Sequence, residues 1–197
     1  MEGETLICGL DEAGRGPLAG PVCAAAVILP PIFPVDFLDD SKKLSSAARE
    51  RARDLICSKA AWGIGWASHE EIDEINILQA SLLAMKRAFE AMAAAEEESG
   101  TKLFFGKDIR AVVDGLFVPN LPVPCEALVK ADSKVPAVMA ASILAKTSRD
   151  RLMEEYALLY PQYGYEKHKG YPTKAHREAI SRWGPSPIQR KSFTAKI

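Results

Sequence analysis

The chain has 197 residues, of which 48% are hydrophobic and 26% are charged, a composition that suits one ordinary globular domain. The formal net charge of −1 excludes a polycation that binds nucleic acid through its overall charge. The longest apolar run covers residues 22–31, too few for a membrane-spanning helix, and the acidic N-terminus lacks the basic region of a signal peptide. The four cysteines form no C-x-x-C pair. We therefore expect a soluble, cytoplasmic protein with reduced thiols and no contact with a membrane.

Three apolar runs in the first third of the chain predict strands, over residues 5–10, 22–29 and 61–67. The first two runs are separated by the Gly/Pro-rich residues 14–21, so we expect adjacent strands that are joined by a turn. Residues 22–29 carry no charged side chain, which predicts a strand that is buried on both faces.

Two helical regions are predicted around the third strand. Ser45 can cap a helix over residues 46–59, whose apolar side chains recur on one face. Ser68 and Glu71 have the spacing of a capping box, which indicates that a helix begins there. A longer helix, rich in Ala, Leu, Met and Glu, is predicted from about residue 77 to residue 98.

The second half of the chain predicts two more strands and a long helical region. Residues 109–113 form an apolar run that ends in Asp114, and residues 125–129 form a similar run. Residues 135–159 predict one or two helices with small side chains that allow close packing. This order of elements favours an α/β fold, with a central mixed five-stranded sheet flanked by helices.

The C-terminal part of the chain differs from the rest in charge and in its content of turn-forming residues. Residues 166–197 carry eight Lys or Arg and two acidic residues, a net charge of +6, so the preceding part is acidic. A polyanionic partner explains this asymmetry, and a solvated basic tail explains it equally well. Because Pro and Gly recur from Pro161 onward, we expect a catalytic domain over residues 1–160 and a basic extension of short helices and loops over residues 161–197.

Carboxylates accompany the ends of three predicted strands. The first strand runs into Asp11 and Glu12, the fourth ends at Asp114, and Asp132 follows the fifth. If these strands are neighbours, the four acids converge and require a cation, and oxygen ligands without His or Cys favour Mg²⁺ or Mn²⁺ over zinc. Two such ions, about 3.5–4 Å apart, form a clamp for phosphodiester cleavage. Each acid alone is more simply a turn residue, so the coincidence of the three positions carries the prediction of a nuclease.

A glycine-rich loop directly follows the first acidic pair. Gly14 and Gly16 permit close approach of the backbone to a ligand, and Arg15 between them can hold a phosphate. A turn without any ligand is an equally good interpretation of the loop alone. The loop matches neither G-x-x-x-x-G-K-[ST] nor G-x-G-x-x-G, which argues against a nucleotide-dependent phosphotransferase.

The chain resembles bacterial ribonuclease HII, the type 2 ribonuclease H, in segments that keep the family's order and run nearly end to end. The two most specific segments are Asp-Glu-Ala-Gly-Arg-Gly-Pro-Leu-Ala-Gly at 11–20 and His-Lys-Gly-Tyr-Pro-Thr-Lys-Ala-His at 168–176. The others lie at residues 40–45, 72–80, 112–115, 130–134, 140–151 and 190–193.

The resemblance implies a ribonuclease H-like fold with a small C-terminal helical extension. It implies an endonuclease that cuts the RNA strand of RNA–DNA hybrids and ribonucleotides embedded in duplex DNA. The cut lies on the 5′ side of the ribonucleotide and leaves 3′-hydroxyl and 5′-phosphate ends. The family's four acidic positions coincide with Asp11, Glu12, Asp114 and Asp132, which are expected to hold Mn²⁺ or Mg²⁺, as two ions when substrate is bound.

The same resemblance implies which residues bind the substrate. Gly14, Arg15 and Gly16 are expected to read the 2′-hydroxyl, and Tyr171 is expected to stack on the deoxyribose beyond the junction. Contacts with the nucleic-acid backbone are expected from Lys42, Lys43, Asn76, Ser142, Lys146, His168 and Lys169. The chain departs from many bacterial relatives at Ala131 and at residues 116–119, and neither position is an expected ligand.

Alternatives stay open at this point. Another metal nuclease or resolvase with the same fold would share the acids without needing Tyr171 or the Gly-Arg-Gly loop. A nucleic-acid-binding module without catalysis would bind a hybrid and not cut it. Residues 189–193 lack the paired aromatic residues of a sliding-clamp motif, so a basic tail that packs on the protein is favoured over a clamp partner. We expect a monomer.

Overall fold

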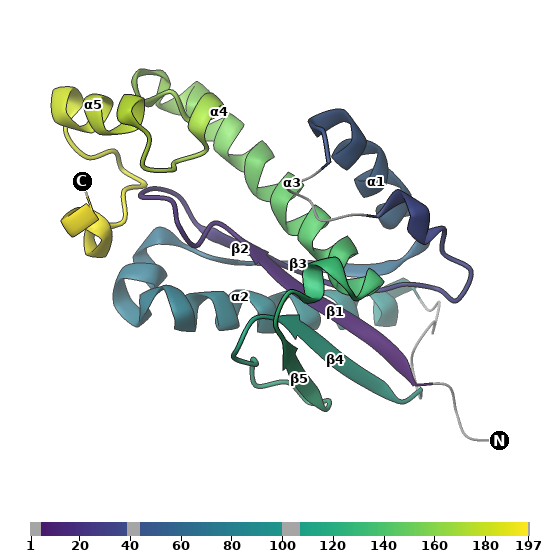
Figure 1. Ribbon diagram of the computed structural model, residues 1–197. Coiled ribbons are helices and arrows are strands. Elements are labelled where there is room, and N and C mark those ends of the chain that lie inside the picture. The colour runs from purple at the N-terminus through teal and green to yellow at the C-terminus, as the bar shows by residue number, and fades with distance from the viewer. Residues whose placement is uncertain (1–4, 39–43, 100–106, 197) are drawn as a thin grey trace.

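The structure, a computed structural model, describes residues 5–38, 44–99 and 107–196. Its centre is a five-stranded sheet in the order β3-β2-β1-β4-β5, with helices on both faces (Figure 1). This confirms the predicted α/β fold with a mixed sheet. The strands are β1 Leu6–Ala13, β2 Val22–Ile28, β3 Ala61–Ala67, β4 Ile109–Asp114 and β5 Cys125–Leu128.

The sheet is antiparallel on one side of β1 and parallel on the other. β1 pairs antiparallel with β2, and β2 pairs antiparallel with β3. On the other side β1, β4 and β5 run parallel, with Leu10 of β1 opposite Val113 of β4. The carboxyl ends of these three strands therefore lie at one edge of the sheet. This is the arrangement on which the predicted convergence of the acids depends.

β1 is longer than predicted. The apolar run ended at residue 10, but the strand continues through Asp11 and Glu12 to Ala13. The reason is the neighbouring strand, because Asp11, Glu12 and Ala13 pair with Ala25, Ala24 and Cys23 of β2. The acidic pair thus lies within the ladder, which restricts its backbone more than a loop would.

The helices that cover the sheet begin where their capping residues predict. α1, Ser46–Lys59, starts after Ser45, whose Oγ accepts a hydrogen bond from the backbone N of Ala48 at 3.2 Å. Before α2, His69–Ser99, Glu71 Oε2 accepts from the N of Ser68 at 2.8 Å, and Ser68 Oγ accepts from the N of Glu71 at 3.2 Å. This reciprocal pair is the predicted capping box.

Alternating residues of β2 build one core on each face of the sheet. Ala24 and Ala26 face the core formed with α2, while Ala25 and Val27 face the core formed with α1 and α3, Pro136–Leu159 (Figure 1). α2 lies very close to β3, because a Cβ at Gly65 would stand 2.1 Å from the carbonyl oxygen of Ala84.

The C-terminal elements lie at the far end of α3, beside the turn that joins β1 and β2 (Figure 1). They include α4, Tyr165–His168, and α5, Lys174–Trp183. Their apolar side chains pack with the end of α3 and with the β1–β2 turn, in a cluster of Ala19, Met153, Ala157, Tyr163, Tyr165 and Ile188. The boundary between residues 160 and 161 stays a prediction. Among the described residues, no helix is both long and apolar enough to cross a bilayer.

Candidate active site

A pocket of about 440 Å³ opens at the carboxyl ends of β1 and β4. Ala13 is the only residue of its lining that was not predicted as a site residue. The lining consists of Asp11, Glu12, Ala13, Gly14, Arg15, Gly16, Asp114, Ser142, Lys146 and Tyr171. The strand ends, the glycine-rich loop, α3 and the segment before α5 therefore contribute to one site.

Asp11 is the most buried carboxylate of the pocket, with 6% of its surface exposed. Its Oδ1 accepts a hydrogen bond from the backbone N of Glu12 at 2.7 Å. Burial, followed by the charges of Glu12 and Asp114, raises the pKa of Asp11 well above its ordinary value, while a hydrogen bond from Ser142 acts in the opposite direction. A divalent cation beside these carboxylates would stabilise their charged forms, so the residues present fit such an ion.

Glu12 lies against the guanidinium of Arg15. The Nη1 of Arg15 is 3.2 Å from the Oε1 of Glu12, and the Arg15 side chain is half exposed whereas that of Glu12 is largely covered. Burial raises the pKa of Glu12, and the nearby Arg15 partly opposes this effect. Arg15 thus connects the acidic edge of the sheet to the glycine-rich loop.

Asp114 connects β4 to the turn that carries Asp132. Its Oδ1 accepts a hydrogen bond from the N of Ala131 at 2.8 Å. Asp132, in the 3-10 helix η2 Ala131–Ser133, is 7% exposed and does not line the pocket. Within the described parts of the chain, no three Asp, Glu, His or Cys side chains group closely enough to hold a metal ion by themselves. Magnesium commonly takes one or two carboxylates together with water and substrate phosphates.

The glycine-rich loop faces Tyr171. Gly14 has a φ of +104°, and a Cβ there would stand 2.1 Å from the Nε of Arg149, so this position requires glycine. A Cβ at Gly16 would meet the ring of Tyr171 at 3.4 Å. Tyr171 is 41% exposed, which leaves part of its ring available to a ligand.

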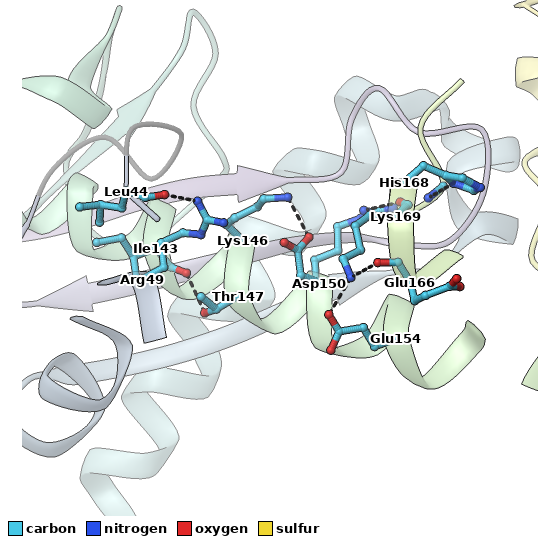
Figure 2. Close-up of polar contacts among 12 residues, drawn as sticks. Leu44, Arg49, Ile143, Lys146, Thr147, Asp150, Glu154, Glu166, His168 and Lys169 are labelled. Carbon is cyan, nitrogen blue, oxygen red and sulfur yellow. Dashed lines mark hydrogen bonds and ion pairs between the residues drawn. The ribbon is translucent and has the colours of Figure 1, made fainter. Parts of the chain in front are cut away.

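Two lysines predicted as substrate contacts form ion pairs with acids of α3 (Figure 2). The Nζ of Lys146, inside the pocket, is 2.8 Å from Asp150 Oδ1. The Nζ of Lys169 lies outside the pocket, 2.6 Å from Glu154 Oε1 and 2.8 Å from the carbonyl oxygen of Glu166. Lys146 is therefore placed to meet a ligand, whereas Lys169 holds α4 to α3.

His168 is buried, and its expected contact with the substrate stays a prediction. Its Nε2 is 2.8 Å from the carbonyl oxygen of Tyr163, and its Nδ1 accepts from the N of Gly170 at 3.2 Å. Since both ring nitrogens are occupied and the ring does not line the pocket, His168 shapes the segment that leads to Tyr171.

Asn76 also lies outside the pocket. Its φ of 65° interrupts α2, and its Oδ1 accepts from the N of Leu78 and the N of Gln79 at 3.0 and 3.2 Å. This side chain therefore caps the second part of α2. Lys42 and Lys43 lie outside the described residues.

Two residues beside the pocket were given no role by the sequence interpretation. Arg149 and Arg190 are almost completely buried, and their guanidinium groups donate to backbone carbonyls of residues 14–21. Both occur in segments that resemble the family, but an arginine in a basic region predicts exposure. Only the hydrogen-bond pattern distinguishes them from surface arginines.

Comparisons with known proteins show the family of this chain. The family model described as Ribonuclease HII matches residues 8–196. A ribonuclease HII of Treponema denticola is 57% identical over 198 residues, which cover 97% of this chain and 99% of the relative. A ribonuclease HII of Dechloromonas aromatica is 50% identical over 189 residues, 95% of this chain and 90% of the relative.

Solved structures with the same fold include archaeal and bacterial enzymes. The ribonuclease HII in the complex with PCNA from Archaeoglobus fulgidus has a TM-score of 0.71 and 26% identity, and the match covers 96% of this chain and 95% of that one. Bst-RNase HIII in complex with Mn²⁺ has a TM-score of 0.73 at 16% identity, covers 98% of this chain and 68% of that one, and supports the fold alone. The chain belongs to the ribonuclease HII family of endonucleases, which act on RNA–DNA hybrids.

Proposed function

We propose that this enzyme cuts on the 5′ side of ribonucleotides embedded in duplex DNA, in addition to the RNA strand of hybrids. Water attacks the phosphorus, and the bond to the 3′-oxygen of the preceding nucleotide breaks. The products are a 3′-hydroxyl and a 5′-phosphate on the ribonucleotide. The observation that carries this proposal is one pocket lined both by Asp11, Glu12 and Asp114 and by the Gly-Arg-Gly loop with Tyr171.

The carboxylates of Asp11, Glu12 and Asp114, with Asp132 completing the set, are proposed to hold two Mg²⁺ or Mn²⁺ ions. When bound, the ions would supply an activated water and charge stabilisation of the leaving oxygen. The backbone of Asp11 pairs with Ala25 of β2, and that of Asp114 pairs with Leu128 of β5, so their carboxylates need little rearrangement.

The glycine-rich loop and Tyr171 are proposed to distinguish RNA from DNA. Gly14, Arg15 and Gly16 would contact the 2′-hydroxyl, and Tyr171 would stack on the adjoining deoxyribose. Lys146 and Arg15, the cations of the pocket lining, would contact phosphates. Ser142 would act indirectly, through its hydrogen bond to Asp11.

A duplex with a single ribonucleotide tests this function directly. The wild-type protein should cut it once, 5′ of the ribonucleotide, in Mg²⁺ or Mn²⁺, and should leave an all-DNA duplex of the same sequence intact. Asp114→Asn should reduce cutting by up to about 10²-fold, because one of the proposed metal-holding charges is lost. Glu126→Gln, an exposed acid on β5 that pairs with Arg110 at 3.9 Å, is the matched control and should retain it. Equal cutting of the all-DNA duplex, or a fully active Asp114→Asn, would contradict the proposal.

The C-terminal residues 189–193 are proposed to pack on the enzyme instead of binding a sliding clamp. Phe193 is buried, with the guanidinium of Arg190 5.1 Å from its ring centre. Asp73 accepts hydrogen bonds from the N of Lys191 and the N of Ser192, both at 2.8 Å. A clamp that bound these residues would have to detach them, so a direct binding measurement with a bacterial clamp should detect no interaction.

A further inference from the structure

The carbonyl groups of loop 14–21 converge on the buried guanidinium of Arg190. Its Nε donates to the carbonyl oxygen of Gly20 at 2.8 Å, and its Nη1 donates to those of Arg15 and Pro17 at 3.2 and 2.8 Å. Its Nη2 donates to those of Gly14 and Pro21 at 2.6 and 3.2 Å. One side chain therefore bonds five peptide groups of a single loop, and all of its nitrogen atoms take part.

Arg149 of α3 holds the same loop from a second side. Its Nε donates to the carbonyl oxygen of Pro21 at 2.9 Å, and its Nη2 donates to that of Ala19 at 3.2 Å. Its Nη1 donates to the carbonyl oxygen of Lys169 at 3.0 Å, which connects the loop to the segment before Tyr171. Among the described residues, no carboxylate forms an ion pair with Arg149 or Arg190. Backbone carbonyls are thus the groups that compensate these buried charges.

The direction of these carbonyls determines the direction of the neighbouring N–H groups. The described chain has no cis peptide bond, so each carbonyl points away from the N–H of the following residue. Because the carbonyls of Gly14 and Arg15 point to Arg190, the N–H groups of Arg15 and Gly16 point away from it. Within the described residues, backbone bonds hold the N–H of Leu18 and of Gly20 but not these two, and Arg15 and Gly16 line the pocket.

The segment that carries Arg190 is held in place by backbone bonds to the loop and by a side chain of α2. Its backbone N donates to the carbonyl oxygen of Leu18 at 2.9 Å, and Gln189 forms a β-bridge with Ala19. Asp73 of α2 holds the two residues that follow Arg190. The C-terminal segment therefore has a defined position from which Arg190 reaches the loop.

We propose that Arg190 is a positioning residue, which orients the peptide groups of loop 14–21 so that the N–H groups of Arg15 and Gly16 face the substrate. Residues 189–193 are then part of the machinery that selects the ribonucleotide. This inference rests on the proposed function, because it assigns the loop to substrate recognition. Only arginine has donors in a fixed planar fork that can serve five carbonyls, so lysine should replace it incompletely.

The test compares Arg190→Gln and Arg190→Lys with the wild type and with Arg182→Gln as a matched control. Arg182 is an exposed arginine of α5, and its loss removes the same charge from the C-terminal region without touching the loop. The first readout is hydrogen–deuterium exchange of the protein alone, measured by mass spectrometry. The second is kcat and KM on a duplex with a single ribonucleotide.

In Arg190→Gln, the amides of Leu18 and Gly20 should exchange faster, while those of β2 should be unchanged. The kcat should fall by about 10- to 100-fold, the cost of a misplaced reacting group, with a smaller change in KM. Arg190→Lys should lie between this variant and the wild type. Arg182→Gln should leave the exchange of the loop and kcat unaltered.

Normal loop exchange or normal kcat in a folded Arg190→Gln would overturn the inference. If that variant does not fold, the same two readouts on Arg190→Lys decide the question in the same way. A wild-type protein that cuts neither hybrid nor ribonucleotide-containing duplex would refute the proposed function. The exchange experiment would still show whether Arg190 orients the loop, so the two failures are distinguishable.

Discussion

The two sides of the pocket are held by different kinds of contact. Asp11 and Asp114 come together because β1 and β4 are neighbours with a defined register. Loop 14–21 is held by Arg149 and Arg190, which lie 128 to 176 residues further along the chain. The carboxylate side therefore depends on the sheet itself, whereas the loop side depends on contacts with α3 and with the C-terminal segment. Substitutions on the two sides should accordingly affect catalysis and stability differently.

The largest effect is expected from Asp11→Asn on the carboxylate side. The amide keeps an oxygen that can accept from the N of Glu12, but it removes a charge that would hold a cation. Cleavage of a single-ribonucleotide duplex should fall about 10²-fold or more, which corresponds to several kcal/mol of lost transition-state stabilisation. The melting temperature should not fall, since repulsion with Glu12 and Asp114 is relieved. Single-turnover kinetics and thermal unfolding measure both, and unchanged cleavage would remove Asp11 from the site.

Two glycine substitutions distinguish a defect in the stability of the fold from a defect in the function of the loop. Gly65→Ala places a Cβ against the backbone of α2 and should lower the free energy of unfolding by about 1–3 kcal/mol. Gly14→Ala strains a residue with a φ of +104° and meets Arg149, so it should reduce cleavage about tenfold or more with less loss of stability. Urea unfolding and kcat on the same duplex compare the two. A Gly14→Ala that is unstable but fully active per folded molecule would break the contrast.

Tyr171 should show a smaller effect that depends on its ring. Tyr171→Ala is expected to lower kcat/KM by about tenfold, the equivalent of about 1.4 kcal/mol of lost stacking. Tyr171→Phe keeps the ring beside Gly16 and should behave nearly as the wild type. Steady-state kinetics on single-ribonucleotide duplexes measure this, and equal losses in both variants would indicate a role for the hydroxyl group instead.

The smallest effect is a pH dependence of stability in the C-terminal region. The rings of His168 and His176 stack with their centres 4.5 Å apart, and burial lowers the pKa of both below the ordinary value. At these two histidines the unfolded chain then binds more protons than the folded one, so their contribution to stability is complete above about pH 6.5 and is lost below it. The raised pKa values of Asp11 and Glu12 act in the opposite direction, so the test is the difference between the wild type and His176→Phe. Between about pH 7.5 and about pH 5.5, urea unfolding should show a smaller loss of stability, or a larger gain, in His176→Phe than in the wild type, and an identical pH dependence of the two proteins would contradict the assignment.

Much of the fold could be predicted because its signals are local. The cap at Ser45 and the capping box at Ser68 depend on residues three positions away, and the strands follow from short apolar runs. The prediction that Asp11, Glu12 and Asp114 lie close together needed one further assumption, that the first and fourth strands are neighbours. The resemblance to the family added Tyr171 and a role for the glycine-rich loop in reading the 2′-hydroxyl, and the structure places the tyrosine and the loop in the same pocket as these acids.

By itself, the sequence determined the order of the elements, the carboxylates at the strand ends and the family to which the chain belongs. The tertiary structure alone decided which polar residues are buried. His168 faces the interior and Lys169 an acid of α3, while Arg149 and Arg190 hold loop 14–21 from inside. The physical reason is that their partners are backbone carbonyls and side chains from segments that are distant in the sequence. A basic residue has the same sequence signature whether it meets water or a ring of carbonyls, and only the folded chain distinguishes the two.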